Sequence, residues 1–134
     1  MSTWTRSIRV QRFSNKGVFN GPHTVIPIGD ERAFDALFAA TSLMGSFFAT
    51  LESHASWLGQ QRVPYPEARD YLASLFHGLA VSAMSNDEPF SRLSAAFSTP
   101  GGLNEGMTHD LQSQGVFTAY AVALDRILAR IQKG

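Results

Sequence analysis

The stretch FSTPGGLNEGM, at residues 97–107, contains the residues with the clearest potential for chemistry. Two glycines after Pro100 allow a tight backbone turn, and a helix predicted to follow would leave the N–H groups of residues 102–105 without helical partners. Such a helix start suits an anion, for example a carboxylate. The same pattern fits a plain turn between two helices, with Asn104 or Thr99 as the capping residue. The spacing alone favours the plain turn.

The four histidines do not have the spacing of a metal site. Neither a His-x-His nor a His-Glu-x-x-His pattern occurs, and the chain has no cysteine to supply a thiolate ligand. His77 lies beside Phe76 and near Leu79, so we expect it to be partly buried between helices. The histidines are His23, His54, His77 and His109. The sequence therefore predicts no metal site.

Signatures of nucleophilic catalysis and of phosphate binding are also missing. No Gly-x-Ser-x-Gly elbow, no Gly-x-Gly-x-x-Gly turn and no Gly-x-x-x-x-Gly-Lys loop is present. Catalytic triads assemble in space, so a hydrolase that uses Ser98, His109 and Asp110 stays an alternative. It is the weakest one, because no motif supports it.

Apolar periodicity predicts that helices position these residues. Asp30 is a good N-cap for one long central helix that reaches a break at Gln60-Gln61, and its apolar arc over residues 34–58 is broad enough for neighbours on more than one side. Further helices are predicted from Pro64 to Asn86, from Pro89 to Phe97, over 104–113, and from Phe117 to Ile131. The expected fold is an all-α bundle, with residues 30–134 as one helical domain.

Residues 1–29 differ from the rest of the chain. Glycine, asparagine and proline interrupt the short apolar pieces SIRV and TVIPI, which predicts weak strands in an extended N-terminal arm. The arm contains basic residues and no acidic ones, although the net charge of the whole chain is zero. The basic residues are Arg6, Arg9, Arg12 and Lys16. Four charges without clustered aromatics do not favour a nucleic acid or a membrane as partner.

Composition indicates a soluble domain and is compatible with a reducing compartment. Hydrophobic residues make up 44% of the chain, and we see no apolar run of the roughly 18 residues that suggests a membrane span. The absence of cysteine and of a recognisable secretory signal makes the cytoplasm the expected location.

Two segments carry a resemblance to a known family. PFSRLSAAFSTPGGLNEGM followed by GVFTAYAVALDRIL resembles the C-terminal dimerisation domain of pyrroline-5-carboxylate reductase, and the resemblance extends backward to cover residues 30–132. It implies an interlocked homodimer in which the turn holds the carboxylate of a small substrate. The matching substrate-binding positions are Ser98, Thr99, Gly101, Gly102, Leu103 and Asn104.

The sequence departs from this family at three points. Leu103 and Asn104 stand where many members have a small residue and a threonine, and Met44-Gly45-Ser46 replaces a Ser-Gly-Pro-like opening. The dinucleotide-binding domain, about 150 residues in such reductases, has at most remnant strands here, in residues 1–29. We therefore expect that this chain alone binds no cofactor and has incomplete reductase activity. The resemblance implies NAD(P) as the cofactor where a cofactor-binding domain is supplied. The alternative is a non-catalytic dimeric binding or structural module.

Overall fold

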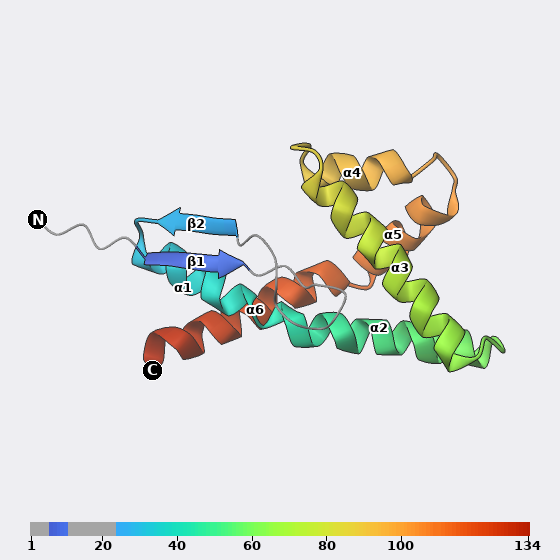
Figure 1. The fold of residues 1–134 in the computed structure, drawn as a ribbon, viewed down its shortest axis with the longest axis horizontal. Helices are drawn as coiled ribbons and strands as arrows, with labels where there is room; N and C mark the ends of the chain where they lie inside the picture. Colours follow the sequence, from blue (N-terminus) through green and yellow to red (C-terminus); the bar gives the residue numbers. More distant parts are fainter. Residues whose placement is uncertain (1–5, 11–23) are drawn as a thin grey trace, which may run out of the picture. The chain divides into compact units, whose positions relative to one another are not determined.

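The computed structural model describes residues 6–10 and 24–134. Two strands, β1 (Arg6–Val10) and β2 (Thr24–Ile28), pair antiparallel, as Figure 1 shows. Their register places Ile8 opposite Ile26. These strands coincide with the extended pieces expected in the N-terminal arm. Arg12, Lys16 and His23 lie outside the described residues.

Six helices follow in the described part of the chain. They are α1 (Glu31–Ala40), α2 (Leu43–Gln60), α3 (Tyr65–Met84), α4 (Phe90–Phe97), α5 (Leu103–Ser113) and α6 (Val116–Lys133). The predicted all-α class is confirmed, and α3, α4, α5 and α6 begin and end close to the residues that the sequence indicates.

The predicted start of the first helix is correct. The side chain of Asp30 accepts a hydrogen bond from the N–H of Arg32 at 3.1 Å, and Glu31 places an acidic group in the first turn. A carboxylate at this position satisfies an N–H group that lacks a helical partner and interacts favourably with the helix dipole.

The single long helix expected over residues 30–60 is interrupted at Thr41 and Ser42. The N–H groups of these two residues bond to carbonyls only three residues back, at 3.1 and 3.0 Å. Their hydroxyls donate to the same carbonyls, those of Phe38 and Ala39, both at 2.7 Å. Serine and threonine hydroxyls compete in this way with the α-helical ladder, which explains why the helix divides into α1 and α2.

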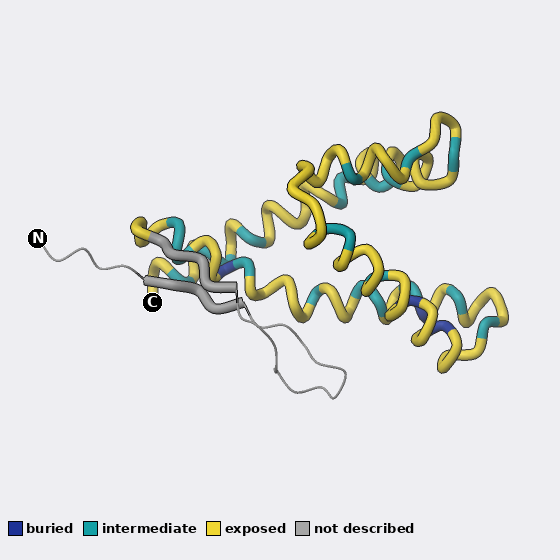
Figure 2. Tube along the Cα trace, turned by 45° about the horizontal axis from the view of Figure 1, so that its top comes forward, coloured by how far each residue is buried: buried dark blue, intermediate teal, exposed yellow. Residues whose placement is uncertain are grey.

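The chain forms two compact units, Met1–Leu43 with Ala121–Gly134 and Met44–Tyr120. In the first unit, α1 packs near the two strands and Ala39 is buried. The second unit has a small core where the C-terminal half of α2 meets the N-terminal half of α3 (Figure 2). That core consists of Ala55, Ala68 and Leu72, with Leu51, Leu58, Val63 and Phe76 packed against it.

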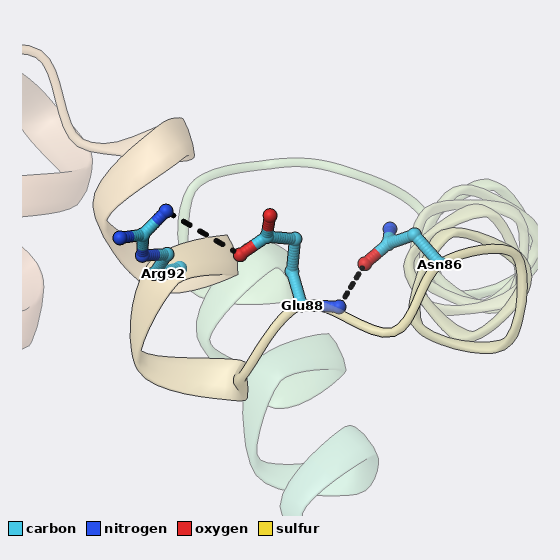
Figure 3. A network of polar contacts seen from close by, with 3 residues as sticks. All are labelled: Asn86, Glu88 and Arg92. Carbon is cyan, nitrogen blue, oxygen red and sulfur yellow. Dashed lines mark hydrogen bonds and ion pairs between the residues drawn. The ribbon is translucent and has the colours of Figure 1, made fainter.

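Prolines and side-chain amides determine where α3 and α4 begin and end. Pro64 is the N-cap of α3, where no backbone N–H is needed, and Pro89 is the N-cap of α4. Between these helices Asn86 donates to the carbonyl of Ser82 at 2.9 Å and accepts from the N–H of Glu88 at 3.0 Å. Figure 3 shows the latter bond together with the 3.7 Å ion pair between Glu88 and Arg92. The predicted stop near Asn86 is confirmed.

Candidate functional site

The turn between α4 and α5 requires both of its glycines. Gly101 has a φ of 72°, in the left-handed region that favours glycine. The N–H of Gly102 donates to the carbonyl of Thr99 at 2.8 Å, and a Cβ on Gly102 would collide with the Thr99 hydroxyl oxygen. The local sequence thus folds into one specific tight turn.

The capping residues differ from the prediction. Gly102 is the N-cap of α5, without a side-chain cap, so neither Asn104 nor Thr99 has that role. Asn104 lies inside the first turn, and its amide donates to the carbonyl of Phe97 at 3.0 Å. A side-chain amide next to the C-terminal end of α4 satisfies a carbonyl there, whereas the start of α5 is left without a cap.

The electrostatics at the start of α5 favour and oppose an anion at the same time. The first N–H groups of an α-helix have no intrahelical partner and carry partial positive charge. Glu105 already places a carboxylate there, 3.5 Å from the N–H of Gly101. An incoming carboxylate would have to displace or be repelled by Glu105. Beside it, Leu103 is 94% exposed.

The predicted substrate-binding residues lie together in this turn because they are nearly consecutive. Ser98 donates its hydroxyl to the carbonyl of Ser94 at 2.8 Å, which directs it toward α4. The residues in question are Ser98, Thr99, Gly101, Gly102, Leu103 and Asn104. Their role in binding stays a prediction.

The structure does not assemble the alternative triad. The carboxylate of Asp110 accepts from the Gln114 amide at 2.8 Å, and none of the hydrogen bonds among the described residues joins Ser98, His109 and Asp110. Without a hydrogen bond from nucleophile to base, this set has no hydrolytic geometry.

The histidines on α2 and α3 lie in different settings. His54 stacks on Phe76, with ring centroids 6.3 Å apart and an interplanar angle of 14°. His77 is exposed, so the prediction that it is partly buried is wrong. Its side chain lies one residue beyond Phe76, which faces α2, and so points elsewhere on α3. Within the described residues no group of three His, Asp or Glu side chains could hold a metal ion.

A hydrogen bond joins α2 to the start of α3. The hydroxyl of Tyr65 donates to a carboxylate oxygen of Glu52 at 2.7 Å. This bond and the negative charge of Glu52 raise the pKa of Tyr65, while Arg69 acts in the opposite direction. Both side chains of the pair are exposed, so the bond lies at the rim of the core rather than inside it.

One apolar stripe on α2 is buried at one end and exposed at the other. Its members, at the three- and four-residue spacing of a helix face, are Met44, Phe47, Phe48, Leu51, Ala55 and Leu58. The last three pack against α3 in the core. The first three are exposed, Phe48 to 62% of its surface. The sequence identified this stripe but not which part of it the chain itself covers.

The facing stripe of α3 has the same division. Ala68 and Leu72 are buried in its N-terminal half, whereas Leu75 and Leu79 further along the same face are exposed. We call Leu51, Ala55, Leu58, Ala68 and Leu72 the closed end of the helix pair. We call Met44, Phe47, Phe48, Leu75 and Leu79 its open end.

Aromatic rings lie at the boundary between the closed end and the open end. Phe47 makes an edge contact with Phe76 across the two helices, with centroids 5.7 Å apart, and another with Phe48 at 5.4 Å. Such contacts stabilise a pair by about 0.5–1.5 kcal/mol beyond the burial of its area. Beyond these rings the open-end side chains are left exposed to solvent.

The apolar character of this region is also visible at the level of hydropathy. The helical stretch Glu31–Gln60 contains an apolar segment of 18 residues that the described chain leaves almost entirely exposed. It is long and apolar enough to cross a membrane, contrary to the sequence expectation. A helix face that a partner protein covers can be equally apolar and equally exposed in the single chain.

Comparison with known protein families gives a match over most of the chain. No curated protein and no solved structure is similar enough to be matched. Residues 31–134 match the family described as pyrroline-5-carboxylate reductase dimerisation, a range that begins with α1 and contains all six described helices. The chain therefore belongs to the pyrroline-5-carboxylate reductase dimerisation family.

Proposed function

We propose that residues 31–134 act as a homodimerisation module, in which a second copy covers the open end of the α2–α3 pair. The observation that carries the proposal is the continuous apolar stripe on each helix, buried by the chain itself over only half its length. Exposed apolar surface of this extent marks an interaction site. An isologous two-fold dimer would pair the same patch of each copy and form an interlocked bundle.

The free energy gained by burying the open-end side chains can be compared with the cost of association. This comparison indicates whether the open end alone can form the interface. Full burial of one such side chain gives about 1.5–3 kcal/mol, and the open-end side chains are already near half burial. Five of them thus give roughly 4–7 kcal/mol in each copy, against an association cost of about 4–15 kcal/mol. We infer that the interface also includes exposed apolar side chains of α4, α5 and α6, such as Phe97, Met107 and Phe117.

A protein partner fits the exposed surface better than a bilayer does. A membrane span is apolar on all sides, whereas the apolar residues of α2 form a stripe. Glu52 and Ser53 lie on the remaining surface of the helix, and Glu52 is engaged with Tyr65. We accordingly propose a soluble dimer, with the cytoplasm as its location.

A measurement of the mass of the full chain in solution tests the proposed homodimerisation. Light scattering over a range of concentrations should give twice the 14.6 kDa of one chain. A single 14.6 kDa species at the highest concentration would contradict the proposal. Association with vesicles instead of self-association would favour the membrane alternative.

A finer proposal concerns the turn before α5. In a complete reductase of this family, we propose that residues 98–104 hold the carboxylate of a small cyclic substrate through the N–H groups that begin α5. The uncapped helix start supports this role, and so does the lack of room for a side chain at Gly102. Glu105 opposes it, so we expect weak binding by this chain alone.

The described residues do not fit a nicotinamide cofactor. Such cofactors bind at a glycine-rich turn between a strand and a helix of a parallel βαβ unit, whereas β1 and β2 are antiparallel. Hydride transfer is therefore proposed only where another domain supplies the cofactor site. Titration of the dimer with NADPH, followed by fluorescence, should show no binding; micromolar affinity would reveal a site built by the remaining residues.

Replacement of Gly102 by alanine tests whether folding of the turn requires glycine at this position. The added Cβ meets the Thr99 side chain, so we expect a loss of stability of about 1–3 kcal/mol by thermal denaturation. Asn104→Thr introduces the residue common in the family; it removes the amide that bonds to the carbonyl of Phe97 but leaves Gly101 and Gly102 in place. If L-proline shifts the amide NMR signals of residues 102–105 in neither the natural chain nor N104T, the turn is structural and the non-catalytic alternative holds.

A further inference from the structure

We infer that a hollow on one flank of the α2–α3 pair receives an apolar side chain of a second copy and anchors the dimer. The inference rests on the proposed homodimerisation and adds the place where the partner inserts. The hollow measures about 240 Å³ and lies entirely within the second unit. Its inner wall includes Leu51 and Ala55 of α2 and Leu72 and Ala73 of α3.

The hollow exists because small residues face each other across the two helices. Ala55 and Ala73 leave space where larger side chains would close the gap, while Ala55 and Leu72 are themselves buried and form its floor. Close packing is the rule in protein interiors, and unfilled apolar walls lose contacts with partner atoms. A side chain inserted here would gain those contacts at little conformational cost, since the walls are preformed helices.

The rim of the hollow is polar. Glu52 and Tyr65 are joined by their 2.7 Å hydrogen bond, and Arg69 lies nearby on α3. All three side chains are exposed in the single chain. An apolar centre surrounded by a polar rim is the usual composition of an interface hot spot, where the rim excludes water and fixes the register.

Size and position favour a second copy over a small molecule. Ligand pockets usually span about 300–1,000 Å³ and converge several polar groups on the ligand, whereas this hollow is smaller and its inner wall is apolar. Phe48 contributes both to the hollow and to the open end, so the two form one continuous surface. A partner that covers the open end therefore reaches the hollow as well.

Filling the hollow from within tests the inference. Ala73→Leu adds a side chain to the wall at an exposed position of α3 and barely changes helix propensity. We expect the dimer dissociation constant of A73L to rise about thirty-fold or more in sedimentation experiments, with helicity unchanged. The matched control, Ala129→Leu on the exposed surface of α6, should leave the constant within about two-fold.

A second variant keeps the inference testable if A73L folds poorly. The chain has no cysteine, so Ala73→Cys introduces a single thiol whose reaction with a maleimide reports its access to solvent. The thiol should react at least ten times more slowly above the dimer dissociation constant than below it, whereas Ala129→Cys should react equally at both.

The outcomes separate the two proposals. A natural chain that is monomeric at all concentrations overturns the homodimer itself. A natural chain that is dimeric, together with an A73L dimer of unchanged affinity or an A73C thiol of unchanged reactivity, overturns only the hollow as anchor. Weakened A73L association or a protected thiol supports it.

Discussion

The closed and open ends of the α2–α3 pair are chemically alike and structurally different. Leu72 and Leu79 belong to the same face of α3, yet Leu72 is 7% exposed and Leu79 is 38% exposed. The difference arises because α2 reaches only the first part of that face. An apolar stripe on a helix thus indicates that its surface is covered. The stripe does not indicate whether the same chain or another chain covers it.

The largest expected effect separates folding from association. Leu72→Asp should unfold the second unit, because a charge enters the core without a partner, at a cost of more than about 4 kcal/mol. Far-UV circular dichroism should show the loss of helix. A folded L72D chain would mean that the closed end is not the core.

The same substitution at the open end should have another outcome. Leu79→Asp should keep its helicity, because Leu79 is already partly in water, and should weaken the dimer by about 2–4 kcal/mol. The measurement is sedimentation of the variant beside Val81→Asp, an exposed residue on the opposite side of α3. Equal dimerisation of L79D and V81D would remove the distinction between the two faces.

A smaller effect is expected from replacing Gly78, which lies next to Leu79 of the open end. A Cβ at Gly78 would meet nothing within 4 Å, and glycine in a helix interior is less favourable than alanine by about 0.5–1 kcal/mol. In the L79D background, Gly78→Ala should therefore raise the thermal midpoint. If it stabilises that background but weakens the dimer of the otherwise natural chain, a partner backbone passes close to Gly78.

The smallest effect concerns the pair of side chains that joins the helices near the closed end. The hydrogen bond to Glu52 and its negative charge raise the pKa of Tyr65 in the folded chain, so the contribution of this pair is present below the pKa of the unfolded tyrosine, about 10. It is lost as the pH rises through the folded value. An absorbance titration should find a lower Tyr65 pKa in Glu52→Gln than in the natural chain. An identical titration would show that the pair does not form in solution.

Much of the fold was predictable because its signals are local. Asp30 as N-cap, Pro64 and Pro89 at helix starts, and the glycines at 101 and 102 each act within a few residues of their own position. Three- and four-residue spacing then identified the core-facing residues Leu51, Ala55 and Leu58 of α2 and Leu72 of α3, but it did not identify Ala68.

The features that sequence reasoning missed depend on contacts between residues far apart in the chain or on competition between hydrogen bonds. The turn at Thr41 and Ser42 arises from hydroxyls that compete with the backbone ladder, which no apolar period reveals. The exposure of His77 and the division between closed and open ends depend on where α2 lies beside α3. Asn104 was misplaced as a cap because its amide bonds to Phe97, seven residues earlier.

Isotope-filtered NMR on a mixture of labelled and unlabelled chains tests the central claim most directly. The account predicts contacts between copies at the methyl groups of Met44 and Leu79, at the open end, and none at Leu58 in the core of each chain. Contacts between copies that avoid Met44 and Leu79, or no such contacts at concentrations where the chain is dimeric, would contradict it.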